Sequence, residues 1–194
     1  MRRKKLIKKI FKKAFNSMLF TNIEPPPEDS LAELEEVMHQ HSNRKNKASM
    51  QKDLDLNPPE LFNKIVKDGG YECDIKHIKY IGRAIEPIIM FHKSIYKRKR
   101  PSAYAKEIGV DWSGDDDKMS TVSTPSYPSG HACQGYYRAY IMSDKYPDLK
   151  DKFINLAEAI SQSRIDRGVH YPSDIEGGKE LAVKLYENRK KNKS

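Results

Sequence analysis

Residues 163–174 read Ser-Arg-Ile-Asp-Arg-Gly-Val-His-Tyr-Pro-Ser-Asp and separate two segments with helical character. Pro172 suits the first position of a new helix, which places His170 just before that helix and Asp174 in its first turn. A carboxylate there is favoured by the helix dipole and can reach back to a ring nitrogen of His170. This hydrogen bond would fix the tautomer of the imidazole and leave its other nitrogen available as a base, a nucleophile or a metal ligand. A purely structural His–Asp pair would show the same pattern.

A second stretch, residues 125–131, reads Pro-Ser-Tyr-Pro-Ser-Gly-His and precedes an apolar helical segment. Ser129 is a typical helix N-cap, and the free backbone N–H groups of the first turn can face an anion. Gly130 allows close backbone approach, and His131 would stand beside the anion with a transferable proton. An ordinary capped helix with a surface histidine is the alternative interpretation.

The third stretch is basic: residues 93–101 read Lys-Ser-Ile-Tyr-Lys-Arg-Lys-Arg-Pro. In a helix, Lys93 and Arg100 would lie two turns apart and nearly on one face. Pro101 disfavours helical geometry at Arg100, so the helix is expected to end there and let the guanidinium turn inward. The alternative is a basic helix end that only complements the dipole.

Charge balance separates the two kinds of site that these stretches could build. The two histidines of the motifs and Asp174 could hold a metal ion. However, Lys93, Arg100 and Arg164 would place up to three fixed positive charges beside a divalent cation. The same side chains suit a tetrahedral oxyanion, since guanidinium groups bind phosphate oxygens in pairs. The pattern therefore favours a phosphate site over a metal site.

Together the three stretches resemble the signature of the type 2 phosphatidic acid phosphatase superfamily, which includes bacterial non-specific acid phosphatases and vanadium haloperoxidases. The signature is K-x6-R-P, then P-S-G-H, then S-R-x5-H-x3-D, and the segment from Lys93 to Asp174 matches every specified position. The resemblance implies an all-α fold, a compact helical bundle of the acid phosphatase and vanadium haloperoxidase type. The sequence itself shows helical periods and no convincing strand pair.

The resemblance also implies a role for each matched residue. His170 is the expected nucleophile, Asp174 its orienting partner, and His131 the general acid and base. Five further matched positions would bind the phosphoryl oxygens: Lys93, Arg100, Ser129, Gly130 and Arg164. No metal ion is expected. Vanadate is expected as an inhibitor, or as a prosthetic group if the same pocket belongs to a haloperoxidase.

Helices are expected over about 131–146, 149–167 and 172–191, with loops over 42–53 and 102–127, the second bordering the pocket. The predicted organisation is a basic amphipathic helix, a linker with an accessory helix, a phosphatase-like helical domain and a basic tail, at residues 1–22, 23–57, 58–188 and 189–194.

The net charge of +9 lies in the two ends of the chain. Twelve of the 36 basic residues precede Glu24 or follow Glu187, which leaves 24 basic against 27 acidic residues between them. No specific nucleic-acid partner is therefore expected. Residues 1–20 form a basic amphipathic stripe that could contact a membrane or a partner, or dock on the protein's own domain. Two cysteines, no signal peptide and no membrane-spanning run predict a cytoplasmic protein, with peripheral membrane contact as an option.

The resemblance, together with the charge pattern of the motifs, implies a metal-independent phosphatase that hydrolyses phosphomonoesters, or lipid or pyrophosphate esters, through a phosphohistidine intermediate. The expected substrate is a phosphorylated small molecule or lipid, and oligomeric state is left open. One alternative is a vanadate-dependent haloperoxidase, although a chain of 194 residues is short for that branch. The other is a non-catalytic protein that binds membranes or nucleic acid through its basic N-terminus.

Overall fold

The computed structural model describes residues 21–28, 30–44, 48–112, 114, 115, 119 and 122–192. This part of the chain forms α-helices and one short 3₁₀ helix, and it contains no strand, which confirms the predicted all-α class. The helices are α2 (Leu31–Ser42), α3 (Ala48–Leu56), α4 (Pro58–Asp68), α5 (Ile75–Arg83), α6 (Glu86–Tyr96), α7 (Pro101–Glu107), α8 (Gly130–Lys145), η2 (Pro147–Leu149), α9 (Lys150–Asp166) and α10 (Pro172–Lys191).

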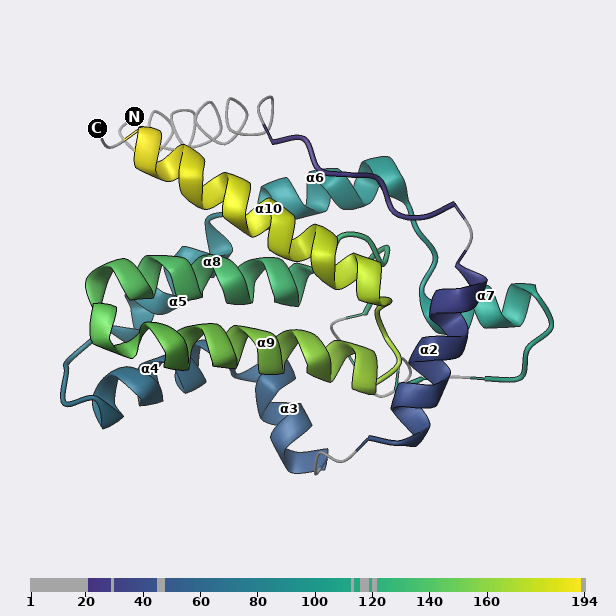
Figure 1. Cartoon of the computed structure of the whole chain (residues 1–194), viewed down its shortest axis with the longest axis horizontal. Helices are drawn as coiled ribbons and strands as arrows, with labels where there is room; N and C mark the ends of the chain where they lie inside the picture. Colours follow the sequence, from purple (N-terminus) through teal and green to yellow (C-terminus); the bar gives the residue numbers. More distant parts are fainter. Residues whose placement is uncertain are drawn as a thin grey trace, which may run out of the picture.

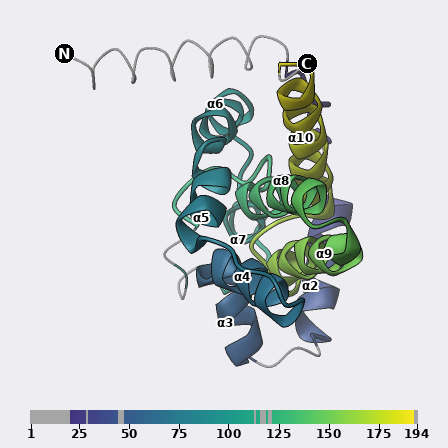
Figure 2. The same ribbon diagram turned by 90° about the vertical axis from the view of Figure 1, so that its left-hand side faces the viewer.

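The antiparallel helices α8 and α9 form the centre of the fold, and α10 crosses α8 on one side (Figures 1 and 2). Helices α4 and α5 cover the opposite side of this pair. The main core lies between these five helices and α6, because each presents apolar side chains to it. Its fully buried members include Phe62, Ile78, Met142, Phe153, Ile160 and Leu181.

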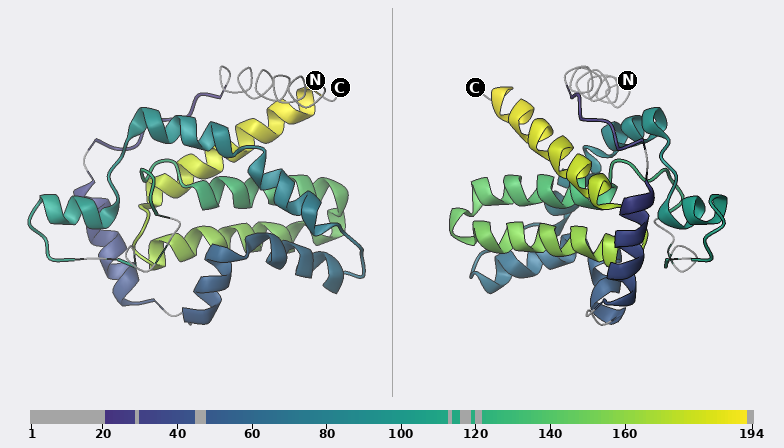
Figure 3. Two further views of the ribbon diagram at one scale, coloured as in Figure 1. Left: turned by 180° about the vertical axis from the view of Figure 1, so that it is seen from behind. Right: turned by 45° about the vertical axis from the view of Figure 1, so that its right-hand side comes forward.

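A smaller apolar cluster holds α2 and α7 against the end of α9 and the start of α10. The rear view shows α2 and α7 at this end of the fold (Figure 3, left). Tyr171, immediately before α10, is fully buried in this cluster. Its other buried members are Leu34, Val37, Ala105, Ala132, Ile165 and Ile175. This second core fixes the turn between α9 and α10, which carries His170.

Helices α8 and α10 approach closely where the predicted motifs meet. A Cβ atom built on Gly178 of α10 would lie 2.6 Å from the carbonyl oxygen of Ser129, which precedes α8. Only glycine fits this approach without movement of the backbone. In addition, the Ser129 amide donates a 2.8 Å hydrogen bond to the backbone carbonyl of Asp174. The second and third motif stretches are therefore joined through the backbone.

Two expected loops contain short helices. Part of the loop expected over 42–53 is α3, which packs against α4 and α9, and the start of the loop expected over 102–127 lies in α7. Neither helix has the length or apolar period by which a helix is recognised in a sequence. Of the predicted segments at the two ends, residues 1–20 lie outside the described residues, and the basic tail begins inside α10, which runs to Lys191.

None of the helices in the described ranges is both long enough and apolar enough to cross a bilayer.

Candidate active site

The predicted site residues stand at helix ends and turns around one end of the α8–α10 pair. Lys93 lies in the last turn of α6 and Arg100 just before α7, while Arg164 lies in the last turn of α9. The others flank the starts of two helices: Ser129, Gly130 and His131 at α8, and His170 and Asp174 at α10. Sequence-distant segments thus supply one site.

The Asp174 carboxylate is completely buried and accepts hydrogen bonds from four donors. Its Oδ2 accepts from His170 Nδ1 at 3.0 Å, from the Tyr171 amide at 2.9 Å and from the Ser126 hydroxyl. Its Oδ1 accepts from Arg98 Nη1 at 2.9 Å. A buried charge is stable only when it is paired and hydrogen-bonded, and each oxygen here is satisfied. The predicted contact between Asp174 and the imidazole is present.

The second nitrogen of His170 faces a cation. Arg100 Nη1 lies 3.1 Å from His170 Nε2, and because a guanidinium can only donate, Nε2 must accept. The imidazole proton is then on Nδ1, directed at Asp174. Burial, followed by the positive charges of Arg100, Lys93 and Arg164, holds the pKa of His170 well below its usual value. His170 therefore keeps an unprotonated Nε2 at neutral and mildly acidic pH.

Backbone carbonyls hold the two basic side chains of the first motif. Lys93 Nζ donates to the carbonyls of Pro125 and Ser126, the latter at 3.1 Å, and Arg100 donates from Nε to Thr124 at 3.0 Å. The helix that was expected to end at Arg100 ends earlier, because α6 stops at Tyr96 and the next residue, Lys97, is left-handed. Arg100 is instead extended before α7, which turns its side chain inward.

Burial lowers the pKa of Lys93 to about 7, and the neighbouring Arg100 and Arg164 charges act in the same direction. Burial likewise lowers the pKa of Arg164 to about 10, so that guanidinium keeps its charge at neutral pH. Clustered cations disfavour one another's charge, and an anion placed among them would relieve that repulsion.

The start of α8 has the predicted capped geometry. The Ser129 hydroxyl accepts a 3.4 Å hydrogen bond from the Ala132 amide. The Cα of Gly130 is uncrowded, since a Cβ built there would be no closer than 3.7 Å to Ile89. His131 follows with its Nε2 3.0 Å from the backbone carbonyl of Asp55.

Asp55 of α3 was not predicted from the sequence, and its carboxylate links the second and third motif stretches. Its Oδ1 lies 2.5 Å from Arg164 Nη1 and 3.2 Å from His131 Nε2, and its Oδ2 lies 3.6 Å from Arg167 Nη1. Burial and Arg164 lower the pKa of His131, while its contacts with Asp55 oppose this effect. An isolated acid in a polar segment carries no signal in the sequence that separates it from a surface residue.

Arg98 was also missed, and it anchors Asp174 from behind. Besides Asp174, it donates to Glu33 Oε2 at 2.6 Å and to the Ser30 hydroxyl at 2.9 Å. Its guanidinium carbon lies 4.0 Å from the centre of the Tyr171 ring. Burial opposes its charge, but Asp174 and Glu33 more than offset this and raise the pKa of Arg98. Arg98 lies in the basic run at 97–100, in which Arg100 is also buried. Nothing in that run distinguishes Arg98 from its exposed neighbours Lys97 and Lys99.

The ligand chemistry of the described residues fits an anion. Within the described ranges, no three His, Cys, Asp or Glu side chains gather as a metal-binding group. By contrast, Lys93, Arg100 and Arg164 all act electrostatically on His170. Such a cluster can bind a tetrahedral oxyanion beside an imidazole that is free to attack it.

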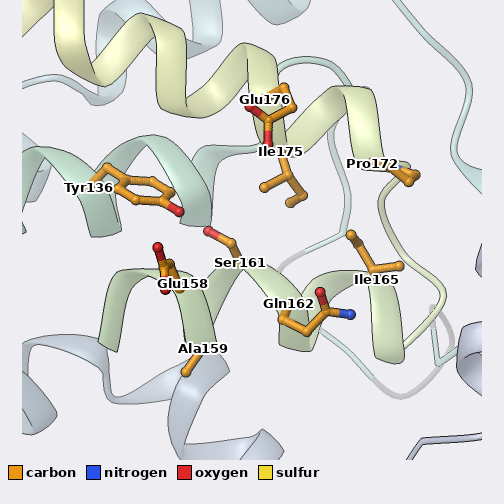
Figure 4. A pocket seen from close by; sticks show the side chains of 9 residues that line it. All are labelled: Tyr136, Glu158, Ala159, Ser161, Gln162, Ile165, Pro172, Ile175 and Glu176. Carbon is orange, nitrogen blue, oxygen red and sulfur yellow. The ribbon is translucent and has the colours of Figure 1, made fainter. Parts of the chain in front are cut away.

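Two cavities lie near this region. One of about 350 Å³ between α8, α9 and α10 is lined by residues such as Tyr136, Glu158 and Glu176, and holds none of the predicted site residues (Figure 4). The other, of about 280 Å³, is bordered by Asp55 and His131. Only the second adjoins the chemistry.

Residues 81–183, just over half of the chain, match the family model described as the PAP2 superfamily. The chain belongs to the PAP2 superfamily. The matched segment contains every residue of the three motif stretches, whereas Asp55 and α2 lie before it.

Related proteins are named as acid phosphatases. The chain is 28% identical over 139 residues to a non-specific acid phosphatase of Providencia stuartii, which covers 68% of this chain and 55% of that protein. It is 27% identical over 130 residues to a non-specific acid phosphatase of Salmonella typhimurium, covering 64% and 45%. The chain therefore spans about half the length of these curated relatives.

A solved PAP2 protein shares the fold. A transmembrane PAP2-type phosphatidylglycerolphosphate phosphatase from Bacillus subtilis superposes with a TM-score of 0.52, at 18% sequence identity. The superposition covers 95% of this chain and 94% of that one. At this identity the likeness shows the helical arrangement alone.

The lowered pKa of Lys93 predicts how anion binding in this PAP2 site depends on pH. Sulfate keeps a constant charge between pH 6 and pH 8, and both site histidines are neutral over most of this range. If binding requires charged Lys93, with its pKa of about 7, the sulfate dissociation constant rises about tenfold from pH 6 to pH 8. Calorimetric titration of the wild type and of Lys93→Arg measures this. The arginine variant is expected to lose the dependence, and an equal slope in both proteins would contradict the assignment.

Proposed function

We propose that the protein is a phosphatase that hydrolyses phosphate esters through a phosphohistidine formed on His170. The observation that carries this proposal is the orientation of one imidazole. Its Nδ1 is directed at the buried Asp174, and its unprotonated Nε2 lies 3.1 Å from Arg100 among the site cations. PAP2 membership and the names of the acid phosphatase relatives support the same reaction class.

In the first step, His170 Nε2 attacks phosphorus while the bond to the leaving alcohol breaks. Asp174 stabilises the positive charge that develops on the imidazole, and Lys93, Arg100 and Arg164 stabilise the charge on the phosphoryl oxygens. His131 gives its proton to the leaving oxygen. Because two oxygens of Asp55 face His131 Nε2, Nδ1 is the nitrogen available for this transfer.

In the second step, His131 takes a proton from water, and the resulting nucleophile attacks the phosphohistidine. The bond between phosphorus and Nε2 breaks, inorganic phosphate leaves, and His170 returns to its neutral state. The Ser129 hydroxyl and the Gly130 amide complete the proposed phosphate contacts at the start of α8. The cations of the chain supply the charge stabilisation, so no metal ion is part of the proposal.

We also propose that the substrate is a phosphorylated small molecule or a lipid phosphate. Residues 1–20, outside the described residues, are proposed to contact a membrane peripherally, in a cytoplasmic protein. The alternative is a haloperoxidase that binds vanadate with the same positively charged side chains. An assay of bromide oxidation with added vanadate and peroxide distinguishes a haloperoxidase from a phosphatase.

The covalent intermediate provides the direct test of the mechanism. Brief reaction with a ³²P-labelled phosphomonoester and acid-free denaturation is expected to leave label on the wild type that is stable to base and labile to acid. His170→Ala is expected to lose labelling and about 1,000-fold or more of its turnover. Turnover is expected to survive EDTA and to be blocked by vanadate. A base-labile phosphoenzyme, or labelling that persists in His170→Ala, would show that another residue is the nucleophile.

The position of Asp55 predicts a shift in the pH profile. The active form of the enzyme needs a neutral His170 and a protonated His131. Because the pKa values of both histidines are lowered, the highest activity is expected at acidic pH. Asp55→Asn removes a charge that favours protonated His131, so the alkaline limb of kcat/KM is expected to move down by about one pH unit. Asp53→Asn, an exposed change in the same helix, is the matched control and leaves the limb in place. An unmoved limb in Asp55→Asn would refute this role.

A further inference from the structure

The cavity of about 280 Å³ beside His131 contains a set of charges that the proposed reaction does not use. One wall is α8, the second is α5, and the start of α4 closes a third side. Asp55 and His131 stand at the edge shared with the phosphate site. In the proposed mechanism His131 protonates the leaving oxygen, so a space that begins at His131 is placed to receive the leaving group.

The wall formed by α8 runs from His131 to a buried arginine. His131, Gln134 and Arg138 all line the cavity, and their spacing of three and four residues puts them on one helix face. The backbones of His131 and Arg138 are separated by about 10 Å along the axis. Side chains of a helix lean toward its N-terminus, which in α8 is the direction of His131.

Arg138 is a buried positive charge that has no acidic partner among the described residues. The residue is 5% exposed, and only its Nε has a hydrogen-bond acceptor among the described residues, the Ile78 carbonyl at 3.3 Å. No described carboxylate lies within ion-pair distance of its guanidinium. Burial lowers the pKa of Arg138 to about 10, with Glu60 opposing this from further away, so it remains charged at neutral pH. Buried charges are costly unless a counter-charge compensates them.

A glycine on the neighbouring helix leaves space for the Arg138 guanidinium. Gly82 of α5 packs against it, and a Cβ built on that glycine would lie 1.9 Å from Arg138 Nη2. A side chain at position 82 would therefore push the arginine out of its place. The fit shows that the position of the charge is specified by two helices.

The other charges of the cavity leave it suited to an anion. Lys79 and Arg83, one turn apart on α5, add two positive charges, although Lys79 also forms a 2.7 Å ion pair with Glu60. The acids of the lining are Asp55, which is engaged by Arg164 and His131, and the exposed Glu86. Glu86 is thus the lining acid that would oppose an incoming anion.

We propose that this cavity binds a second phosphate group carried by the leaving alcohol, so that the preferred substrates are small bisphosphates. The inference rests on the proposed function for the site at His170. One phosphate would meet Lys93, Arg100 and Arg164, and the second would meet Arg138 with Arg83 and Lys79. Because the two phosphate sites are joined by a short stretch of α8, the group that links the two phosphates must be compact.

The test compares hexane-1,6-diol bisphosphate with its monophosphate by the ratio of their kcat/KM values. The wild type is expected to prefer the bisphosphate about tenfold, beyond the factor of two for its two equivalent ends. Arg138→Gln is expected to lose this preference, and Arg138→Lys to retain most of it. Glu86→Gln, which removes the opposing acid, is expected to increase it. Arg189→Gln removes a positive charge outside the cavity and is expected to keep the wild-type ratio.

Two further measurements keep the result decisive. Should Arg138→Gln fail to fold, the exposed Arg83→Gln is expected to lower the ratio about threefold, and Gly82→Ala to lower it by displacing the guanidinium. Absence of turnover with both compounds would count against the proposed function instead, and the calorimetric affinity of the two compounds then tests the cavity. A wild-type preference for the bisphosphate no greater than the statistical factor of two, in kcat/KM or in affinity, would overturn the inference. A preference unchanged in Arg83→Gln and Arg138→Gln would overturn it as well.

Discussion

The buried carboxylate of Asp174 is the interaction on which the site depends. It has no contact with solvent, so each of its oxygens must find donors within the protein. Those donors come from three segments: Ser126 precedes α8, Arg98 follows α6, and His170 and the Tyr171 amide precede α10. Satisfying one charge therefore brings these segments together and sets the direction of the imidazole.

The electrostatics of the site follow from the same burial. Burial, together with the positive charges of Arg100, Lys93 and Arg164, lowers the pKa of His170, which keeps Nε2 unprotonated. Their mutual repulsion is the cost of this arrangement, and Asp55 offsets part of it through its 2.5 Å contact with Arg164. A phosphate ester would supply the remaining negative charge. The site is thus arranged for an anion before that anion arrives, which is the condition for electrostatic catalysis.

The sequence predicted those parts of the site that depend on residues close together along the chain. Pro172 predicted the start of α10, and with it the contact between Asp174 and His170 one turn apart. Ser129 predicted the start of α8 in the same way. These are local relations, in which one residue type at one spacing has a single favourable geometry.

The residues that were missed act across long sequence distances. Asp55 reaches Arg164 from more than 100 residues away, and Arg98 joins Asp174 to Glu33 of α2. Neither contact has a characteristic spacing, because both depend on how helices pack. The loop expected over 102–127 illustrates the same limit. Thr124, Pro125 and Ser126 orient Arg100 and Lys93 with backbone carbonyls, which carry no residue-specific signal.

The proposed reaction depends on the orientation of the His170 imidazole, whose protonation state can be measured directly. Long-range ¹H–¹⁵N correlation spectra of the histidine side chains, with His170→Gln for assignment, report the tautomer and its titration. The account predicts a proton on Nδ1, a bare Nε2 and a titration midpoint clearly below that of an exposed histidine. A proton on Nε2 would contradict this orientation, because that nitrogen could not then attack phosphorus. A midpoint near 6.5, which is ordinary for histidine, would contradict the lowered pKa of His170.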